Sequence, residues 1–298
     1  WDNPTLSDLV ESIDIIDASG AVRTFSEAEV GAEVMQAARL NLGLFGVIDR
    51  MTLRAEPAGR VRSVDRMDLT MAEVLENLDD IVAAHDYVDL FWWPFNERLW
   101  LKTYDRTDDP VTLRPGQLAR ESLTDFFTVR SGVAFYDWLV RHPLATPDTS
   151  RLLFSLLKGR DVVEPISNAI HYQDFIELLK VANTEFAVPV TRDLSNARRA
   201  WQMVVDITDA FAAQGQYPFN LTLNARFVRN SEALLSPAFG NEHTCFIEIL
   251  SYYNTPGWRR FSAAVAREWM TIEGARPHWP KEFQQIPGIG PFVRRTLG

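Results

Sequence analysis

The chain has 298 residues, which is enough for one large domain or two of ordinary size. Hydrophobic residues at 46% and charged residues at 23% give the balance of a folded globular protein and exclude a disordered one. The net charge of −10 argues against nucleic acid as the main partner, because phosphate binding needs a basic surface, and no stretch approaches the roughly 20 apolar residues that cross a bilayer.

The single cysteine and the first residue lead to two further expectations. Cys245 excludes an internal disulfide and a cysteine-based metal cage, and its apolar neighbours favour a small buried side chain. A cytoplasmic location fits this absence of disulfides. The chain begins with Trp1 instead of methionine and shows no export signal, so we expect that a preceding segment is missing.

The first predicted elements run from residue 8 to residue 57. Residues 8–25 predict a β-hairpin, with two strands joined by an Asp-Ala-Ser-Gly turn. Residues 26–40 have helical spacing, with Ser26 as the N-cap and Glu29 completing a capping box. Residues 41–57 predict a turn with two glycines that leads into a strand.

The character of the sequence changes near residue 60. Up to residue 170, the pattern predicts a strand over 61–69, an amphipathic helix over 70–86, strands over 87–95 and 99–107, and mixed helices and loops over 105–170. Beyond it, we expect a strand ending near 190, the strongest helix over 195–215, strands over 220–228 and 245–253, a helix over 258–272 and a loop over 273–288. This order favours an α+β fold in which an antiparallel sheet carries helices on one face.

Gly43 and Gly46 mark the turn before the strand that ends near residue 53. Glycine lets a backbone pass close to a flat or charged group, because no Cβ intrudes. A tight turn entering a strand explains the pattern equally well.

The strand over 220–228 carries two polar side chains on one face. Alternation places Asn224 and Arg226 on the same side and Ala225 and Phe227 on the other. Polar groups on an otherwise apolar strand need partners or a ligand. A solvated face is the alternative.

Glu248 interrupts the apolar run of the strand over 245–253 and shares a face with Phe246 and Leu250. A buried carboxylate tends to acquire a raised pKa, which suits a general base working near neutral pH. A structural carboxylate paired with an arginine is the alternative.

The loop over 275–283 gathers His278, Trp279 and Lys281 between prolines. Loops held by a scaffold often carry function, although Trp279 could simply pin this loop to the core. The aromatic run over 91–95 indicates core packing. The spacing of the other histidines predicts no metal site: His85, His142, His171 and His243.

In this order, the segments resemble the vanillyl-alcohol-oxidase superfamily of FAD-linked oxidases, in particular the aldonolactone and alditol oxidases and the flavin-linked cholesterol oxidase. LGLFGVIDRMTLRAEP is similar to the stretch that closes the family's FAD domain, and VDLFWWPFNERLWLKTYDRT to the first cap strands. LNARFVRNSEALLSPAFG is similar to a Glu-x-Arg pair with a Leu-Ser-Pro link, and GARPHWPKEF to an Arg-Pro-His-Trp-x-Lys loop. The resemblance implies the end of an FAD-binding domain over 1–58, a substrate-binding cap over 59–274, and an active-site loop returning towards the FAD domain over 275–298.

The resemblance also assigns site residues. Arg226 falls on the family arginine that faces flavin and substrate, and Lys281 on the active-site lysine. Asn224 stands where the family usually has glutamate, and Glu248 is the candidate for the missing carboxylate and for the base. These four are the expected catalytic residues. Six residues are expected to contact the cofactor: Leu42, Gly43, Gly46, Val47, Ile48 and His278.

The implied activity is oxidation of a CH–OH group of a sugar lactone, a polyol or a sterol. Hydride passes to N5 of FAD, and the electrons pass to oxygen or to another acceptor. The family's pyrophosphate loop and its flavin-linked histidine belong to an N-terminal segment that this sequence does not contain. The alternative is a non-catalytic, cap-like ligand-binding module, or an inactive relative without a complete FAD site.

Overall fold

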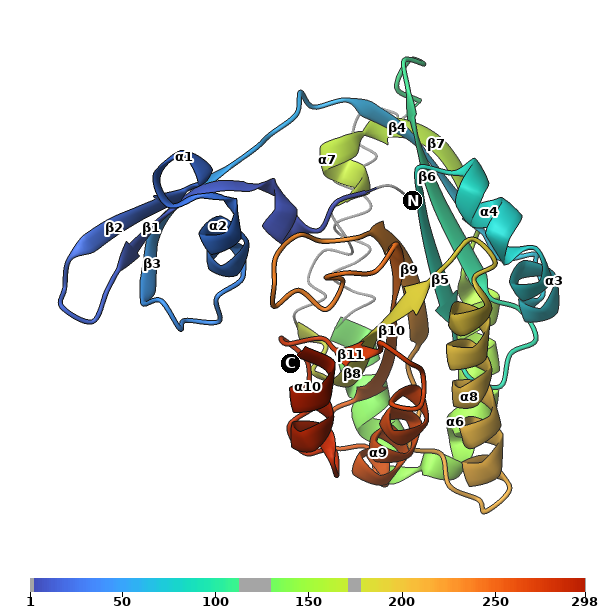
Figure 1. Cartoon of the computed structure of the whole chain (residues 1–298). Helices are drawn as coiled ribbons and strands as arrows, with labels where there is room; N and C mark the ends of the chain where they lie inside the picture. Colours follow the sequence, from blue (N-terminus) through green and yellow to red (C-terminus); the bar gives the residue numbers. More distant parts are fainter. Residues whose placement is uncertain (1–2, 113–129, 171–177, 298) are drawn as a thin grey trace.

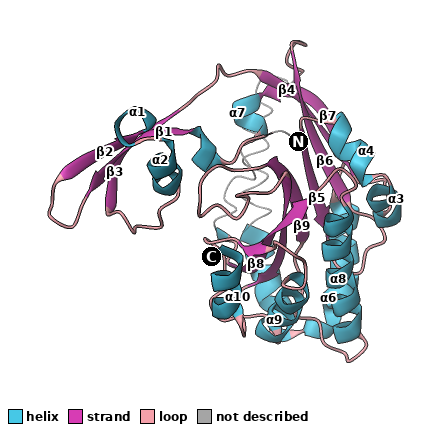
Figure 2. Cartoon of the chain, in the orientation of Figure 1, coloured by secondary structure: helices cyan, strands magenta, loops and turns pink. Residues whose placement is uncertain are grey.

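The structure is a computed structural model that describes residues 3–112, 130–170 and 178–297. It contains a three-stranded sheet in the order β2-β1-β3 and an eight-stranded sheet in the order β11-β8-β10-β9-β5-β6-β4-β7 (Figure 1). Every strand pair in both sheets is antiparallel. The α+β fold with a large antiparallel sheet and flanking helices is therefore confirmed (Figure 2).

The small sheet confirms the predicted hairpin and the strand after it. Its strands are β1 (Val10–Ile16), β2 (Val22–Ser26) and β3 (Val47–Leu53). Ile13 and Ile15 of β1 are fully buried against Met35 of the following helix. Alternation on a short strand thus supplies the small core of this sheet.

The single helix predicted over 26–40 is wrong, because two shorter helices occupy this stretch. They are α1 (Glu27–Val30) and α2 (Ala32–Arg39). Gly31 between them has φ +79°, a left-handed conformation that interrupts a helix. The Ser26 side chain makes no capping hydrogen bond, so the predicted capping box is also absent here.

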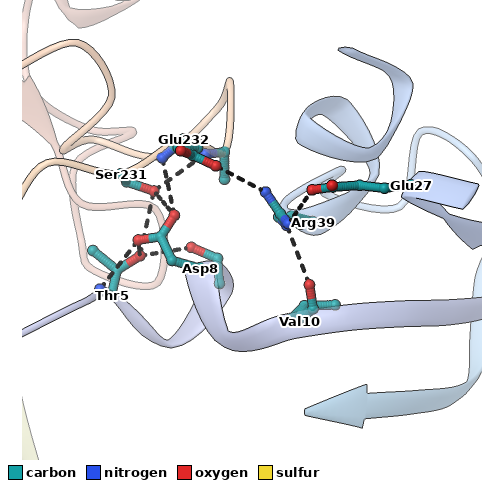
Figure 3. Close-up of polar contacts among 9 residues, drawn as sticks. Thr5, Asp8, Val10, Glu27, Arg39, Ser231 and Glu232 are labelled. Carbon is teal, nitrogen blue, oxygen red and sulfur yellow. Dashed lines mark hydrogen bonds and ion pairs between the residues drawn. The ribbon is translucent and has the colours of Figure 1, made fainter. Parts of the chain in front are cut away.

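The chain before β1 is tied to the loop that follows β9 (Figure 3). The Asp8 carboxylate accepts hydrogen bonds from Ser231 Oγ at 2.8 Å and from the Glu232 backbone N–H at 2.9 Å. Arg39 forms ion pairs with Glu27 at 2.8 Å and with Glu232 at 3.3 Å. These contacts join the small sheet to the large one.

The large sheet contains all the strands predicted beyond residue 60. Its strands are β4 (Arg60–Arg66), β5 (Tyr87–Trp92), β6 (Trp100–Thr107), β7 (Arg160–Pro165), β8 (Val181–Val190), β9 (Leu223–Arg229), β10 (His243–Tyr252) and β11 (Arg276–Pro277). Two of them were not predicted, because β7 lies in the stretch expected to hold helices and loops, and β11 lies in the expected loop. A two-residue strand such as β11 has no alternation to detect.

Most helices of the second part lie between the strands in sequence, and α10 follows the last strand. They are α3 (Met71–Glu76), α4 (Leu78–Ala84), α6 (Thr146–Leu156), α7 (Ile166–Ala169), α8 (Ser195–Ala212), α9 (Trp258–Trp269) and α10 (Ile289–Leu297), with 3₁₀ turns at Leu6–Leu9 and Pro143–Ala145. The predicted helices α8 and α9 are confirmed, whereas the helix over 70–86 is interrupted at Asn77. In the parts of the chain that the structure covers, no helix has the length and hydropathy needed to cross a membrane.

One face of the large sheet packs against helices and forms the main core. Phe186 of β8 and Ile247 of β10 are fully buried beneath Trp201 of α8 and Trp269 of α9. The rings of Phe186 and Trp269 lie 5.6 Å apart. Since side chains alternate along a strand, the neighbours of these core residues point to the opposite face.

Candidate active site

Charged side chains gather on the face of the large sheet that turns away from α8 and α9. Glu185 of β8, Glu248 of β10 and Asn224 of β9 are directly opposed across three adjacent strands. Arg226 lies two residues further along β9 and therefore shares this face. The prediction that Asn224 and Arg226 lie on the same face of the strand is confirmed.

Glu185 is the centre of the cluster. Its carboxylate is 1% exposed and accepts hydrogen bonds from Arg226 Nη2 at 2.7 Å and from His278 Nδ1 at 2.5 Å. Lys281 Nζ lies 3.8 Å from the same carboxylate. Glu185 was not among the predicted site residues, although it interrupts an apolar strand in the same way as Glu248 does.

Glu248 forms the second acidic position. Its carboxylate accepts hydrogen bonds from Lys281 Nζ at 2.7 Å and from Asn183 Nδ2 at 3.0 Å. Burial, together with the nearby charge of Glu185, raises the pKa of Glu248, and Lys281 opposes this shift. The direct partner of Glu248 is thus a lysine, while the carboxylate that binds Arg226 comes from Glu185.

The pKa of Glu185 is lowered, in contrast to that of Glu248. Burial raises the pKa of this carboxyl, but the hydrogen bond from His278 and the charges of Arg226 and Lys281 outweigh burial, so the pKa lies below its ordinary value. The same pairing raises the pKa of Arg226 against the effect of burial. Glu185 is therefore the carboxylate that stays ionised, and Glu248 is the one that takes up a proton more readily.

The loop over 275–283 reaches the cluster because β11 pairs with β8. The register places Pro277 opposite Phe186, and the His278 backbone N–H donates to the Glu185 carbonyl at 3.0 Å. Trp279 Nε1 donates to the Leu235 carbonyl at 2.5 Å, in the loop that follows β9. Trp279 thus does pin this loop, and its anchoring holds His278 and Lys281 over the sheet.

Asn224 differs from its charged neighbours. Its Oδ1 atom is buried and has no hydrogen-bond partner among the residues that the structure describes. A buried acceptor without a donor costs free energy, typically about 1–3 kcal/mol. Asn224 is thus the polar group of this face whose acceptor the described neighbours leave unsatisfied.

The residues expected to hold the cofactor from the N-terminal side lie on the small sheet. Leu42, Gly43 and Gly46 form the turn before β3, and Val47 and Ile48 begin that strand. Within the described ranges, no hydrogen bond or ion pair links them to the Arg226 cluster. A Cβ on Gly46 would lie 2.2 Å from the Ile16 carbonyl oxygen, so packing inside the small sheet accounts for this glycine. Their contact with a cofactor stays a prediction.

The family described as D-arabinono-1,4-lactone oxidase matches residues 51–288, which is most of this chain. The chain belongs to the D-arabinono-1,4-lactone oxidase family. The FAD-linked oxidase family predicted from the sequence is thereby confirmed, and with it FAD as the cofactor of this family.

Several curated proteins are distantly similar to this chain. L-gulono-1,4-lactone dehydrogenase of Mycobacterium tuberculosis (strain H37Rv) is 27% identical over 283 residues, which cover 94% of this chain and 60% of that protein. L-gulonolactone oxidase of Scyliorhinus torazame is 28% identical over 256 residues, which cover 85% of this chain and 54% of that protein. The chain thus spans less than two thirds of the length of these relatives.

Solved structures show the same fold. The crystal structure of cholesterol oxidase from B. sterolicum superimposes with a TM-score of 0.75 at 16% identity, covering 95% of this chain and 60% of that one. At this identity the likeness establishes the architecture of this family member and not its substrate.

Proposed function

We propose that this chain forms the substrate side of an FAD-dependent oxidoreductase that oxidises a CH–OH group of a sugar lactone. The main support is the cluster in which Glu185 joins Arg226, His278 and Lys281 on the face of the sheet opposite to α8 and α9. Relatives that act on gulonolactone favour a lactone over a sterol. Oxygen or another acceptor would take the electrons, and a cytoplasmic location remains our expectation.

The described residues fit a flavin. The Arg226 and Lys281 side chains are 40% and 21% exposed, whereas Glu185 between them is 1% exposed. The two cations therefore border open space, where they would stabilise negative charge on a bound group. FAD, when bound, supplies the acceptor for the hydride that leaves the alcohol carbon. Arg226, Lys281 and His278 would lie beside it from the cap. The small sheet would contribute Leu42, Gly43, Gly46, Val47 and Ile48.

The residues of the cluster would have different roles in the reaction. Glu248, whose pKa is raised, takes the proton from the substrate hydroxyl near neutral pH. Lys281 holds Glu248 in place and, with Arg226, stabilises the negative charge that develops on the substrate oxygen. The Asn224 amide, which lies opposite Glu248 on the same face, would contact the substrate or the cofactor.

The experiment uses the protein expressed from its complete gene. Purified protein should be yellow with flavin absorption bands, and L-gulono-1,4-lactone should bleach those bands under nitrogen. A panel with a polyol and a sterol tests the other substrate classes. Colourless protein would support the non-catalytic binding module instead, and yellow protein that no alcohol of the panel bleaches would refute the proposed activity.

A further inference from the structure

A row of alternating charges crosses the face of the large sheet that carries the cluster, opposite to α8 and α9. Asp89 of β5 is directly opposed to Arg226 of β9 on one side and to Lys102 of β6 on the other. The row continues to Asp65 of β4 and Arg160 of β7. Directly opposed residues share one face of a sheet, so all five side chains point to the side of the active-site cluster.

Asp89 differs from the other acids of this face because no described residue forms a hydrogen bond or an ion pair with its carboxylate, although the charges of Arg226 and Lys102 act on it. Its side chain is half-buried. Asp65, the next acid in the row, accepts a hydrogen bond from Trp100 Nε1 at 3.1 Å and lies 3.9 Å from Arg160. Glu185 and Glu248 form ion pairs with Arg226 and Lys281, respectively. Asp89 is thus a carboxylate with free acceptor capacity next to Arg226.

The position of Asp89 fits the chemistry of a second hydroxyl group. Neighbouring strands lie about 4.8 Å apart, so a ligand whose reacting hydroxyl binds near Arg226 of β9 would bring an adjacent substituent over Asp89 of β5. An ionised carboxylate is a strong acceptor for O–H donors. An apolar alcohol with one hydroxyl would instead bury this carboxylate without a donor, which is unfavourable.

We propose that Asp89 is a specificity residue whose carboxylate binds a second hydroxyl of the substrate, next to the one that is oxidised. This role rests on the proposed function and adds to it a residue that selects polyhydroxylated substrates over alcohols with an apolar body. Asp89 takes no part in proton or hydride transfer.

The protonation of Asp89 predicts a pH dependence of substrate binding, which tests the proposed role independently. Burial raises the pKa of Asp89 to about 6, against the opposing charges of Arg226 and Lys102. The other titratable groups near it are Tyr87 on its own strand and Tyr104 on β6, both with raised pKa values. Because a protonated carboxyl is a weaker acceptor, the KM for a hydroxylated substrate should rise as the pH falls below about 6.

The test compares Asp89→Asn with the matched control Asp65→Asn in the flavin-loaded protein from the complete gene. The probes are L-gulono-1,4-lactone and its monodeoxy analogues, measured by stopped-flow flavin reduction. Asp89→Asn should raise the KM for the lactone about 10- to 100-fold with little change in the limiting rate. With the analogue that lacks the bound hydroxyl, the variant and the wild type should have similar KM values. The acid-side rise in KM should disappear in the variant, and Asp65→Asn should behave as wild type.

Equal losses with the lactone and with every analogue, or a lower limiting rate at an unchanged KM, would overturn the role of Asp89. In that case, lactone oxidation by the wild type would leave the proposed function standing. Wild-type protein that neither binds the lactone in calorimetry nor oxidises it would refute both. Asp89→Ser serves as the second variant if Asp89→Asn does not fold.

Discussion

Glu185 and Arg226 form an ion pair of 2.7 Å although their strands are not neighbours in the sheet. Strand β10 separates β8 from β9, and the register places Phe246 of β10 directly opposite Arg226. The guanidinium crosses over the Phe246 ring, 6.0 Å from its centroid, to reach Glu185. This arrangement fixes a half-buried guanidinium in one position, as a group that orients a substrate requires.

Replacing Glu185 with Gln should make the stability less sensitive to acid. Because the folded-state pKa of Glu185 lies below the ordinary value of 4.5, its contribution to stability is present above that value and is lost as the pH falls. Glu185→Gln should therefore lower the free energy of unfolding by about 3–5 kcal/mol at pH 7 and by less at pH 3. Urea denaturation at both pH values measures this difference.

Glu164→Gln is the matched control for Glu185, because Glu164 is also 1% exposed and pairs with an arginine, Arg160, at the far edge of the sheet. It should destabilise the fold without weakening the binding of L-gulono-1,4-lactone. A Glu185→Gln variant with unchanged lactone affinity would show that Glu185 has no role in the site.

Replacing Arg226 with Ala should remove stabilisation of the developing negative charge. We expect flavin reduction by the substrate to fall about 100- to 1000-fold, while the fold stays intact, because Glu185 keeps His278 and Lys281 as partners. Anaerobic stopped-flow measures the rate, and circular dichroism checks the fold. Normal reduction in this variant, or an equal loss in the control Arg160→Ala, would remove Arg226 from the mechanism.

Glu248 should determine the pH below which the rate of flavin reduction declines. Its raised pKa predicts that flavin reduction declines at a pH above that expected for an ordinary glutamate, because the protonated carboxyl cannot act as a base. Glu248→Gln should abolish this decline and lower the rate about 100- to 10,000-fold at every pH. A variant that keeps both the rate and the decline would assign the base to another group.

Lys281 should set the position of that decline. Its charge lowers the pKa of Glu248, so removing it in Lys281→Met should raise this pKa and move the decline to higher pH. Lys281→Arg keeps the charge and should leave the decline near its wild-type position. If the profile of Lys281→Met coincides with that of wild type, the ion pair of 2.7 Å does not tune the base.

Much of the fold could be predicted because its signals are local. The strands around Asn224 and Glu248 and the helices α8 and α9 follow from periodicities of two and of 3.6 residues. The errors arose where local signals were weak or overridden. Gly31 broke one predicted helix, Asn77 interrupted another, and β11 is too short to show alternation.

The sequence by itself determined that Arg226 and Asn224 share a face, that Glu248 interrupts a buried strand, and that the loop with His278 and Lys281 carries a family signature. Only the tertiary structure decided that Glu185 is the carboxylate that joins Arg226, His278 and Lys281. Alternation along a strand follows from backbone geometry within a few residues, whereas the partner of a side chain depends on which strands become neighbours and in which register. Strand order is set by the packing of the whole sheet, and no short stretch of sequence contains it.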